Sequence, residues 1–179
     1  MKNLIHITGA VLVISLVLPS FLFAQDSRDS KLIDDSKYAR DQFIKSDGLM
    51  QSLFNNSVGY AIFPNVGKGG IGIGGAAGNG ILFENGKIVG RASMKQVSVG
   101  FQFGGQVYRE VIFFENAAAL DRFKGNNFEF TARASAVAVK SGAAANVKYA
   151  DGVMVFTQEK GGLMYEATIG GQKFNYMSF

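Results

Sequence analysis

A glycine- and lysine-bearing segment offers the most obvious ligand chemistry in the chain. It reads Gly67-Lys68-Gly69-Gly70-Ile71-Gly72 and fits the G-x-G-x-x-G pattern of dinucleotide sites. Such a site also needs a helix that begins here, because the helix N-terminus holds the pyrophosphate. The residues from Ile71 to Gly75 instead alternate as in a strand, and neither Gly67-Lys68 nor Gly86-Lys87 is followed by the Ser or Thr of a P-loop. We therefore expect no nucleotide and no other cofactor.

The same segment could bind phosphate groups through positive charge and backbone amides. We predict that Lys68, in an expected turn, contacts anionic headgroups together with Arg91 and Lys95, which share strand parity. Each Lys or Arg near an anionic membrane contributes about 1 kcal/mol, so several must act together. Amides of the turn would assist if they form an anion nest; they belong to Gly67, Gly69 and Gly70. The alternative is that these charges are scattered and only keep the protein soluble.

The residues of common catalytic and metal sites are scarce. The chain has no cysteine, and its one histidine, His6, lies in the N-terminal segment described below. Nucleophile–base pairs and zinc sites usually need these residue types. Paired carboxylates could act as acid and base, but none of the eight acidic residues after residue 58 lies in a recognisable motif. We expect neither an enzyme nor a metal site.

Residues 1–24 have the pattern of a secretory signal peptide. Lys2 precedes an apolar run from Leu4 to Phe23, and the small residue Ala24 stands before a polar stretch. We expect cleavage after Ala24; an uncleaved membrane anchor is the alternative, because the run is about as long as a spanning helix. Both alternatives export the remaining chain, so we expect a periplasmic or secreted protein, peripheral to a membrane, with residues 25–179 as a single domain.

Residues 25–58 have helical periodicity. Leu32, Ile33, Ala39, Phe43 and Ile44 lie on one broad stripe, and a break is expected at residues 46–48. The stripe either packs on the rest of the domain or lies on a membrane as an amphipathic helix. Six acidic and five basic residues in this region favour packing, because such a helix suits an anionic surface poorly.

Residues 59–179 form a glycine-rich region with the period of β-strands. Strands are expected at 60–66, 70–77, 81–84, 87–99, 101–114, 128–139, 153–158 and 163–176, with a hairpin at Asn85-Gly86. One helix is expected at 115–124, capped by Asn116 and ended by Gly125. This order predicts an α+β fold with a strongly bent antiparallel sheet or a barrel-like meander.

The glycine spacing also predicts a bare strand face. Within one strand Gly70, Gly72 and Gly74 would share a face, and Val97–Val107 repeats the alternation of large and small residues. Two such strands could form a groove that a ligand approaches closely. Alternatively, the small residues only permit sheet curvature or helix docking.

Several segments resemble the SYLF domain, in the same order, from about residue 30 to residue 176. They are Gly59–Gly70, Gly78–Gly80, Val99–Gln106, Val111–Phe123, Val155–Thr157, Lys160–Leu163 and Lys173–Tyr176. The resemblance implies a lipid-binding module: eukaryotic members bind phosphoinositides, some bind actin, and bacterial members are exported and implicated in phospholipid binding. Actin is a partner by resemblance only, since an exported protein would not meet it.

We therefore expect non-catalytic binding to an anionic phospholipid surface, with phosphoinositide-type lipids as the eukaryotic model, and no nucleic-acid partner. Two alternatives stay open: a structural periplasmic or envelope protein without a lipid ligand, and a small outer-membrane β-barrel. The barrel is less favoured because charged and Ala-rich helical segments precede and interrupt the strands.

Overall fold

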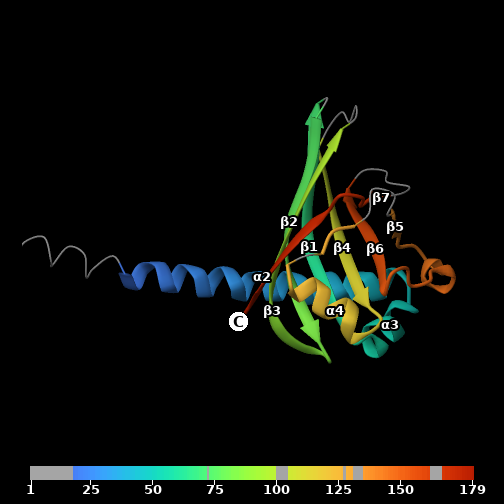
Figure 1. Ribbon diagram of the computed structural model, residues 1–179, viewed down its shortest axis with the longest axis horizontal. Helices are drawn as coiled ribbons and strands as arrows, with labels where there is room; N and C mark the ends of the chain where they lie inside the picture. The colour runs from blue at the N-terminus through green and yellow to red at the C-terminus, as the bar shows by residue number, and fades with distance from the viewer. Residues whose placement is uncertain (1–17, 72, 100–104, 127, 131–134, 162–166) are drawn as a thin grey trace, which may run out of the picture.

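The computed structural model describes residues 18–71, 73–99, 105–126, 128–130, 135–161 and 167–179. It shows the expected α+β architecture (Figure 1). Two helices come first, α2 (Leu18–Ser46) and α3 (Met50–Asn56), and a third, α4 (Ala117–Lys124), is inserted among the strands. The strands are β1 (Gly59–Ile71), β2 (Ile73–Glu84), β3 (Lys87–Val99), β4 (Gln106–Phe114), β5 (Ser135–Ala138), β6 (Val153–Gly161), β7 (Ala167–Thr168) and β8 (Lys173–Ser178), with a 3-10 turn η1 (Ala143–Asn146) before β6.

The strands form one open sheet in the order β7-β5-β6-β4-β1-β2-β3-β8. All neighbouring pairs are antiparallel except β5 and β6, which are parallel, so the sheet is mixed where an antiparallel one was expected. The sheet is not closed: β7 and β8 form its two edges, and the barrel-like form is not adopted. Residues 128–130 lie beside the start of β8, where the Phe174 amide donates to the Phe128 carbonyl and Glu129 forms an isolated bridge with Lys173.

Both faces of the sheet are covered by apolar side chains, and alternate strand residues serve opposite faces. Tyr60 and Ile62 of β1 pack with residues of α2 and α3, whereas Ala61 and Phe63 pack with residues of α4. Figure 1 shows α2 crossing behind the sheet and α4 lying in front of it. A strand buried on both faces reads as a nearly continuous apolar run, which is why residues 60–63 do not alternate with polar ones.

The apolar stripe of α2 packs on the sheet, which is the alternative that the balanced charges of this helix favoured over membrane binding. Ala39 and Phe43 have no exposed surface and lie among core residues of β1 and β2. The break is confirmed at Asp47, whose carboxylate accepts from the Leu49 amide (3.1 Å) and from the Ala144 amide (2.9 Å). No helix among the described residues is both long enough and apolar enough to cross a bilayer. Most of the expected signal segment lies outside the described residues.

The local signals for turns and caps are confirmed, with one exception. Asn85 and Gly86 take φ values of 49° and 75°, as a tight hairpin requires. The Asn116 side chain accepts from the Ala119 amide (3.0 Å) and caps α4. Gly125 ends α4 with an ordinary φ of −73°, and the left-handed conformation falls on Asn126 instead (φ 60°).

The expected strand at residues 70–77 is wrong, because the chain reverses inside it. Ile71 at the end of β1 pairs with Ile73 at the start of β2, so Gly70 and Gly74 face each other across a hairpin rather than sharing one strand. Two other expected strands are interrupted where the structure describes them: residues 128–139 contribute an isolated bridge at Glu129 and β5, and residues 163–176 contribute β7 and part of β8, which begins at Lys173. Residues 131–134 and 163–166 of these two predictions lie outside the described residues. The strand expected at 101–114 begins at Gln106; residues 100–104 and Gly72 lie outside the described residues.

Candidate functional site: a lysine belt at the projecting end of the sheet

The ends of β1–β4 opposite Gly59 and Phe114 project beyond the helices (Figure 1). We call this the projecting end. Strand register places lysines from four strands at about one level there. Lys68 of β1 pairs with Ala76 of β2. The next residue of β2, Ala77, pairs with Lys95 of β3, and Lys95 also pairs with Lys173 of β8. Lys160 of β6 lies in the irregular stretch beside β4. We call this set the lysine belt: Lys68, Lys95, Lys160 and Lys173.

Exposed apolar side chains lie next to the belt. Val97 is 76% exposed and Val107 45%, both unusual for valine in a strand. Val107 belongs to the same cross-strand row as Lys95, because it pairs with Gly67, which pairs with Ala77, the partner of Lys95. Directly paired residues point to the same face, so cation and apolar surface occur together.

The four lysines differ in their surroundings. Lys95 is exposed, and Lys173, 71% exposed, forms an ion pair of 3.4 Å with Glu129. The Lys160 amine donates to the Asn65 side chain. Lys68 is half-buried, and this burial lowers the pKa of its amine. The belt therefore carries positive charge that is only partly neutralised by neighbouring acids.

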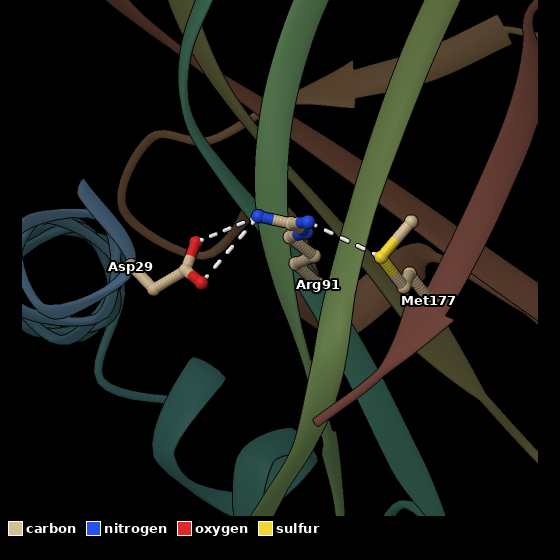
Figure 2. A network of polar contacts seen from close by, with 3 residues as sticks. All are labelled: Asp29, Arg91 and Met177. Carbon is tan, nitrogen blue, oxygen red and sulfur yellow. Dashed lines mark hydrogen bonds and ion pairs between the residues drawn. The ribbon is translucent and has the colours of Figure 1, made fainter. Parts of the chain in front are cut away.

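The three cations predicted from sequence do not form one cluster. Lys68 shares its face with the buried residues Ala76 and Gln96, the α4 side, whereas Arg91 and Lys95 point to the α2 side. Arg91 forms an ion pair with Asp29 of α2 (3.0 Å) and donates to the sulfur of Met177 (3.1 Å), as Figure 2 shows. Strand parity linked Arg91 to Lys95 correctly, but a sequence gives no sign that a helix residue 62 positions earlier faces Arg91.

The turn expected at Gly67–Gly70 is wrong. These residues lie in β1, and their partners are residues of β2 and β4. A nest needs successive amides that converge on one point, whereas amides in a strand alternate in direction. The glycines have other uses: a Cβ on Gly59 would lie 3.3 Å from the Leu120 side chain of α4, which fits helix docking. A Cβ on Gly67 would meet nothing within 4 Å, which leaves an open, bare stretch on the Val97–Val107 face.

Glu110 is a buried acidic residue that the sequence analysis did not single out. Glu110 of β4 is completely buried on the α4 side, where Gln172 Nε2 donates to its carboxyl at 3.1 Å. Burial raises the pKa of Glu110 to about 7, although the Gln172 hydrogen bond acts in the opposite direction. The sequence does contain a signal for this burial. Glu110 alternates in β4 with the same spacing as Tyr108, Ile112 and Phe114, whose side chains all lie in the apolar cluster on the α4 side, so an acid at this position is buried with them.

Comparison with known proteins relates part of this chain to one family. Residues 95–176 match the model of a family described as Ysc84, Las17-binding protein actin regulator, which is the SYLF domain. Residues 95–176 belong to the SYLF family. A curated relative, Beta cell expansion factor A of Aeromonas veronii, is 32% identical over 124 residues, which are 68% of this chain and 47% of the relative. The chain thus spans about half the length of this relative.

SYLF domains are in general binding domains of the lipid- and actin-binding type rather than catalysts. The match covers β4, α4, β6 and β8 and begins at Lys95, so it includes three of the four lysines of the belt. Lys68 lies outside the matched segment.

Proposed function

We propose that this SYLF-family protein binds anionic phospholipid without catalysis, as an exported protein peripheral to a membrane. The observation that supports this best is the lysine belt beside exposed Val97 and Val107 at the projecting end. Cations adjoining exposed apolar surface suit the boundary between headgroups and acyl chains. The localisation rests on the signal-peptide pattern of residues 1–24.

The two faces of the sheet indicate how the protein would approach the membrane. Lys68 and Lys95 lie at one level on opposite faces, so both reach headgroups only if the end of the sheet, not a face, meets the bilayer. From Lys68 to Ile71, the last residue of β1, the chain advances three residues, roughly 10 Å. That length would carry the hairpin past the headgroups into one leaflet, since a bilayer's hydrocarbon core is about 30 Å thick.

Vesicle sedimentation at two salt concentrations tests the proposal. Vesicles of phosphatidylglycerol with phosphatidylcholine should pellet the protein at low salt and less at high salt, because screening weakens the contacts of exposed charges. Pure phosphatidylcholine vesicles should pellet much less of it. Negligible pelleting under all four conditions would contradict lipid binding and leave the structural, ligand-free alternative.

Charge reversal in the belt tests its location. Lys95→Glu with Lys173→Glu should reduce binding to the anionic vesicles by more than tenfold, because each cation contributes about 1 kcal/mol and each reversal adds repulsion. Lys87→Glu is the matched control, since Lys87 is exposed at the other end of the same strand. Arg91→Glu should have a smaller effect than Lys95→Glu, because Arg91 is already paired with Asp29. Equal losses for Lys87→Glu and the double variant would place lipid contact elsewhere.

A further inference from the structure

A cavity of about 480 Å³, lined by both charged and apolar side chains, lies between α2 and the β3–β8 edge of the sheet. Its helix wall includes Arg28, Asp29, Lys31 and Asp35, and its sheet wall includes Arg91. Charges of both signs therefore face one cavity from two elements. This composition differs from the lysine belt, in which the predominant charge is positive.

The charges of this cavity are arranged as exchangeable pairs. Arg91 and Asp29 form a partly buried pair across the cavity, with 31% and 22% of their side chains exposed. Asp35 pairs with Lys31 on the helix surface at 3.1 Å. Among the ion pairs of the described residues, none involves Arg28. A ligand with separate positive and negative groups could take up the cation and the anion of such pairs together.

The floor of the cavity is a row of uncharged polar side chains. Asn79 of β2, Ser93 of β3 and Asn175 of β8 are cross-strand neighbours and point to the same face. All three line the cavity, and no side-chain hydrogen bond is found for them within the described part of the chain. Amide and hydroxyl groups both donate and accept, so the row suits ester oxygens and hydroxyl groups of a ligand.

We infer that this cavity binds a zwitterionic phosphodiester that carries an ammonium group, of the kind found in phosphoethanolamine headgroups. The phosphate would be held by Arg28 and Arg91, because guanidinium groups form strong charge-assisted bonds with phosphate. The ammonium would lie against Asp29 and Asp35. A purely anionic ligand that drew Arg91 to its phosphate would bring no cation to replace Arg91 beside Asp29, and Asp35 would keep only Lys31, so the exchange would oppose binding.

This site is separate from the proposed membrane contact at the belt. A second cavity of about 570 Å³ shares Ser93 and Asn175 with the first and contains Lys95 and Val97. The two cavities are therefore neighbours along β3. A headgroup in the first cavity would have its chains directed toward the membrane-facing end.

Two soluble diesters test the inference on the purified protein. Glycerophosphoethanolamine and glycerophosphoglycerol share the phosphodiester and the glycerol, and differ in whether the second arm ends in an ammonium or in hydroxyl groups. By calorimetry or NMR titration at low salt, glycerophosphoethanolamine should bind at least about fivefold more tightly, the value of one modest ion pair. Equal or reversed affinities, or no measurable binding of either, would overturn the inference.

Substitutions in α2 assign the binding to this cavity. Asp35→Asn should weaken glycerophosphoethanolamine binding and strengthen glycerophosphoglycerol binding, whereas Arg28→Gln should weaken both. Asp34→Asn is the matched control, because Asp34 is 79% exposed on the same helix and does not line the cavity. Unchanged affinities in Asp35→Asn and Arg28→Gln would exclude this cavity as the site.

The same variants separate this inference from the proposed membrane function. Lys95→Glu with Lys173→Glu should lose binding to anionic vesicles and keep glycerophosphoethanolamine binding. Arg28→Gln with Asp35→Asn should show the converse. If the α2 variant lost vesicle binding and diester binding together, the assignment of two separate sites would be wrong.

Discussion

At the scale of single residues, Glu110 is the least expected group in the molecule. Its Oε1 atom, Thr157 Oγ1 and Gln172 Oε1 are buried without a hydrogen-bond partner in the described structure. Thr157 is the direct cross-strand neighbour of Glu110 on β6. Unsatisfied buried acceptors are costly, and one proton on the Glu110 carboxyl would supply a donor to this group of oxygens.

This arrangement predicts that stability falls as pH rises toward and beyond neutrality. The pKa of Glu110 is about 7 when folded and 4.5 at its ordinary value, so the folded state binds the extra proton between these values. The contribution is complete below pH 4.5 and is lost as pH rises through 7; its full size is roughly 3 kcal/mol. Denaturant unfolding at pH 5 and pH 8 measures it. Glu110→Gln should remove most of the difference, and an equally large difference in that variant would assign the effect to another group.

Two glycines that look alike in the sequence should respond oppositely to alanine. A Cβ on Gly80 would collide with the Ile62 carbonyl oxygen and lie 2.8 Å from the Phe63 ring, so Gly80→Ala must displace backbone. We expect a loss of about 2 kcal/mol or more in unfolding free energy. Gly67→Ala meets nothing within 4 Å and should change stability by less than about 0.5 kcal/mol. Similar losses in both variants would mean that backbone flexibility, not space, governs these positions.

At the scale of elements, the cap of α4 can be tested alone. Asn116 accepts from the Ala119 amide, and removal of such a cap typically costs about 1 kcal/mol. Asn116→Ala should therefore lower the unfolding free energy by about that amount, measured by denaturant titration. Asn116→Asp keeps the acceptor oxygen and should lie close to the wild type. A full loss in Asn116→Asp would show that the amide NH₂ group, rather than the cap, is important.

Local chemistry explains which elements the sequence predicted well. The capped helix at 117–124, the hairpin at Asn85-Gly86 and the break at Asp47 each depend on neighbouring residues, and all three were found. The sequence did not predict the hairpin that joins β1 and β2, because isoleucine and glycine alternate from Gly70 to Gly74 without a turn signal. Reversals that depend on pairing partners far along the chain leave no such local trace.

The candidate site was only partly accessible from sequence for the same reason. Lys68 and Lys95 were singled out, but Lys160 and Lys173 join them only through strand pairings between distant segments. Arg91 was assigned to headgroups because its partner Asp29 lies on a helix whose docking angle no spacing reveals. Charge near a glycine-rich stretch indicates a kind of ligand, whereas topology decides which charges act together.

At the scale of the whole molecule, the two apolar clusters depend on each other because they share strands β1 and β4. Tyr60, Ile62, Val111 and Phe113 serve the α2 face, while their immediate neighbours in β1 and β4 serve the α4 face. Neither face can lose its packing without loosening strands on which the other depends. Small domains with such shared elements usually unfold in one cooperative step.

This sharing predicts that damage to either face is felt by the entire domain. Phe43 of α2 and Phe123 of α4 are both fully buried, on opposite faces of the sheet. Phe43→Ala and Phe123→Ala should each cost about 3–5 kcal/mol and shift the whole unfolding transition. Tyr38→Ala is the control, since Tyr38 is 58% exposed on the same helix as Phe43. Far-UV circular dichroism reports the helices and near-UV tyrosine signals report the core, so coincident unfolding curves in each variant support unfolding as one cooperative unit.

The contrary result would be a Phe43→Ala variant that loses helix signal while its tyrosine signal persists. In that case α2 would be a separable layer, and a lipid-bound form with α2 displaced would become possible.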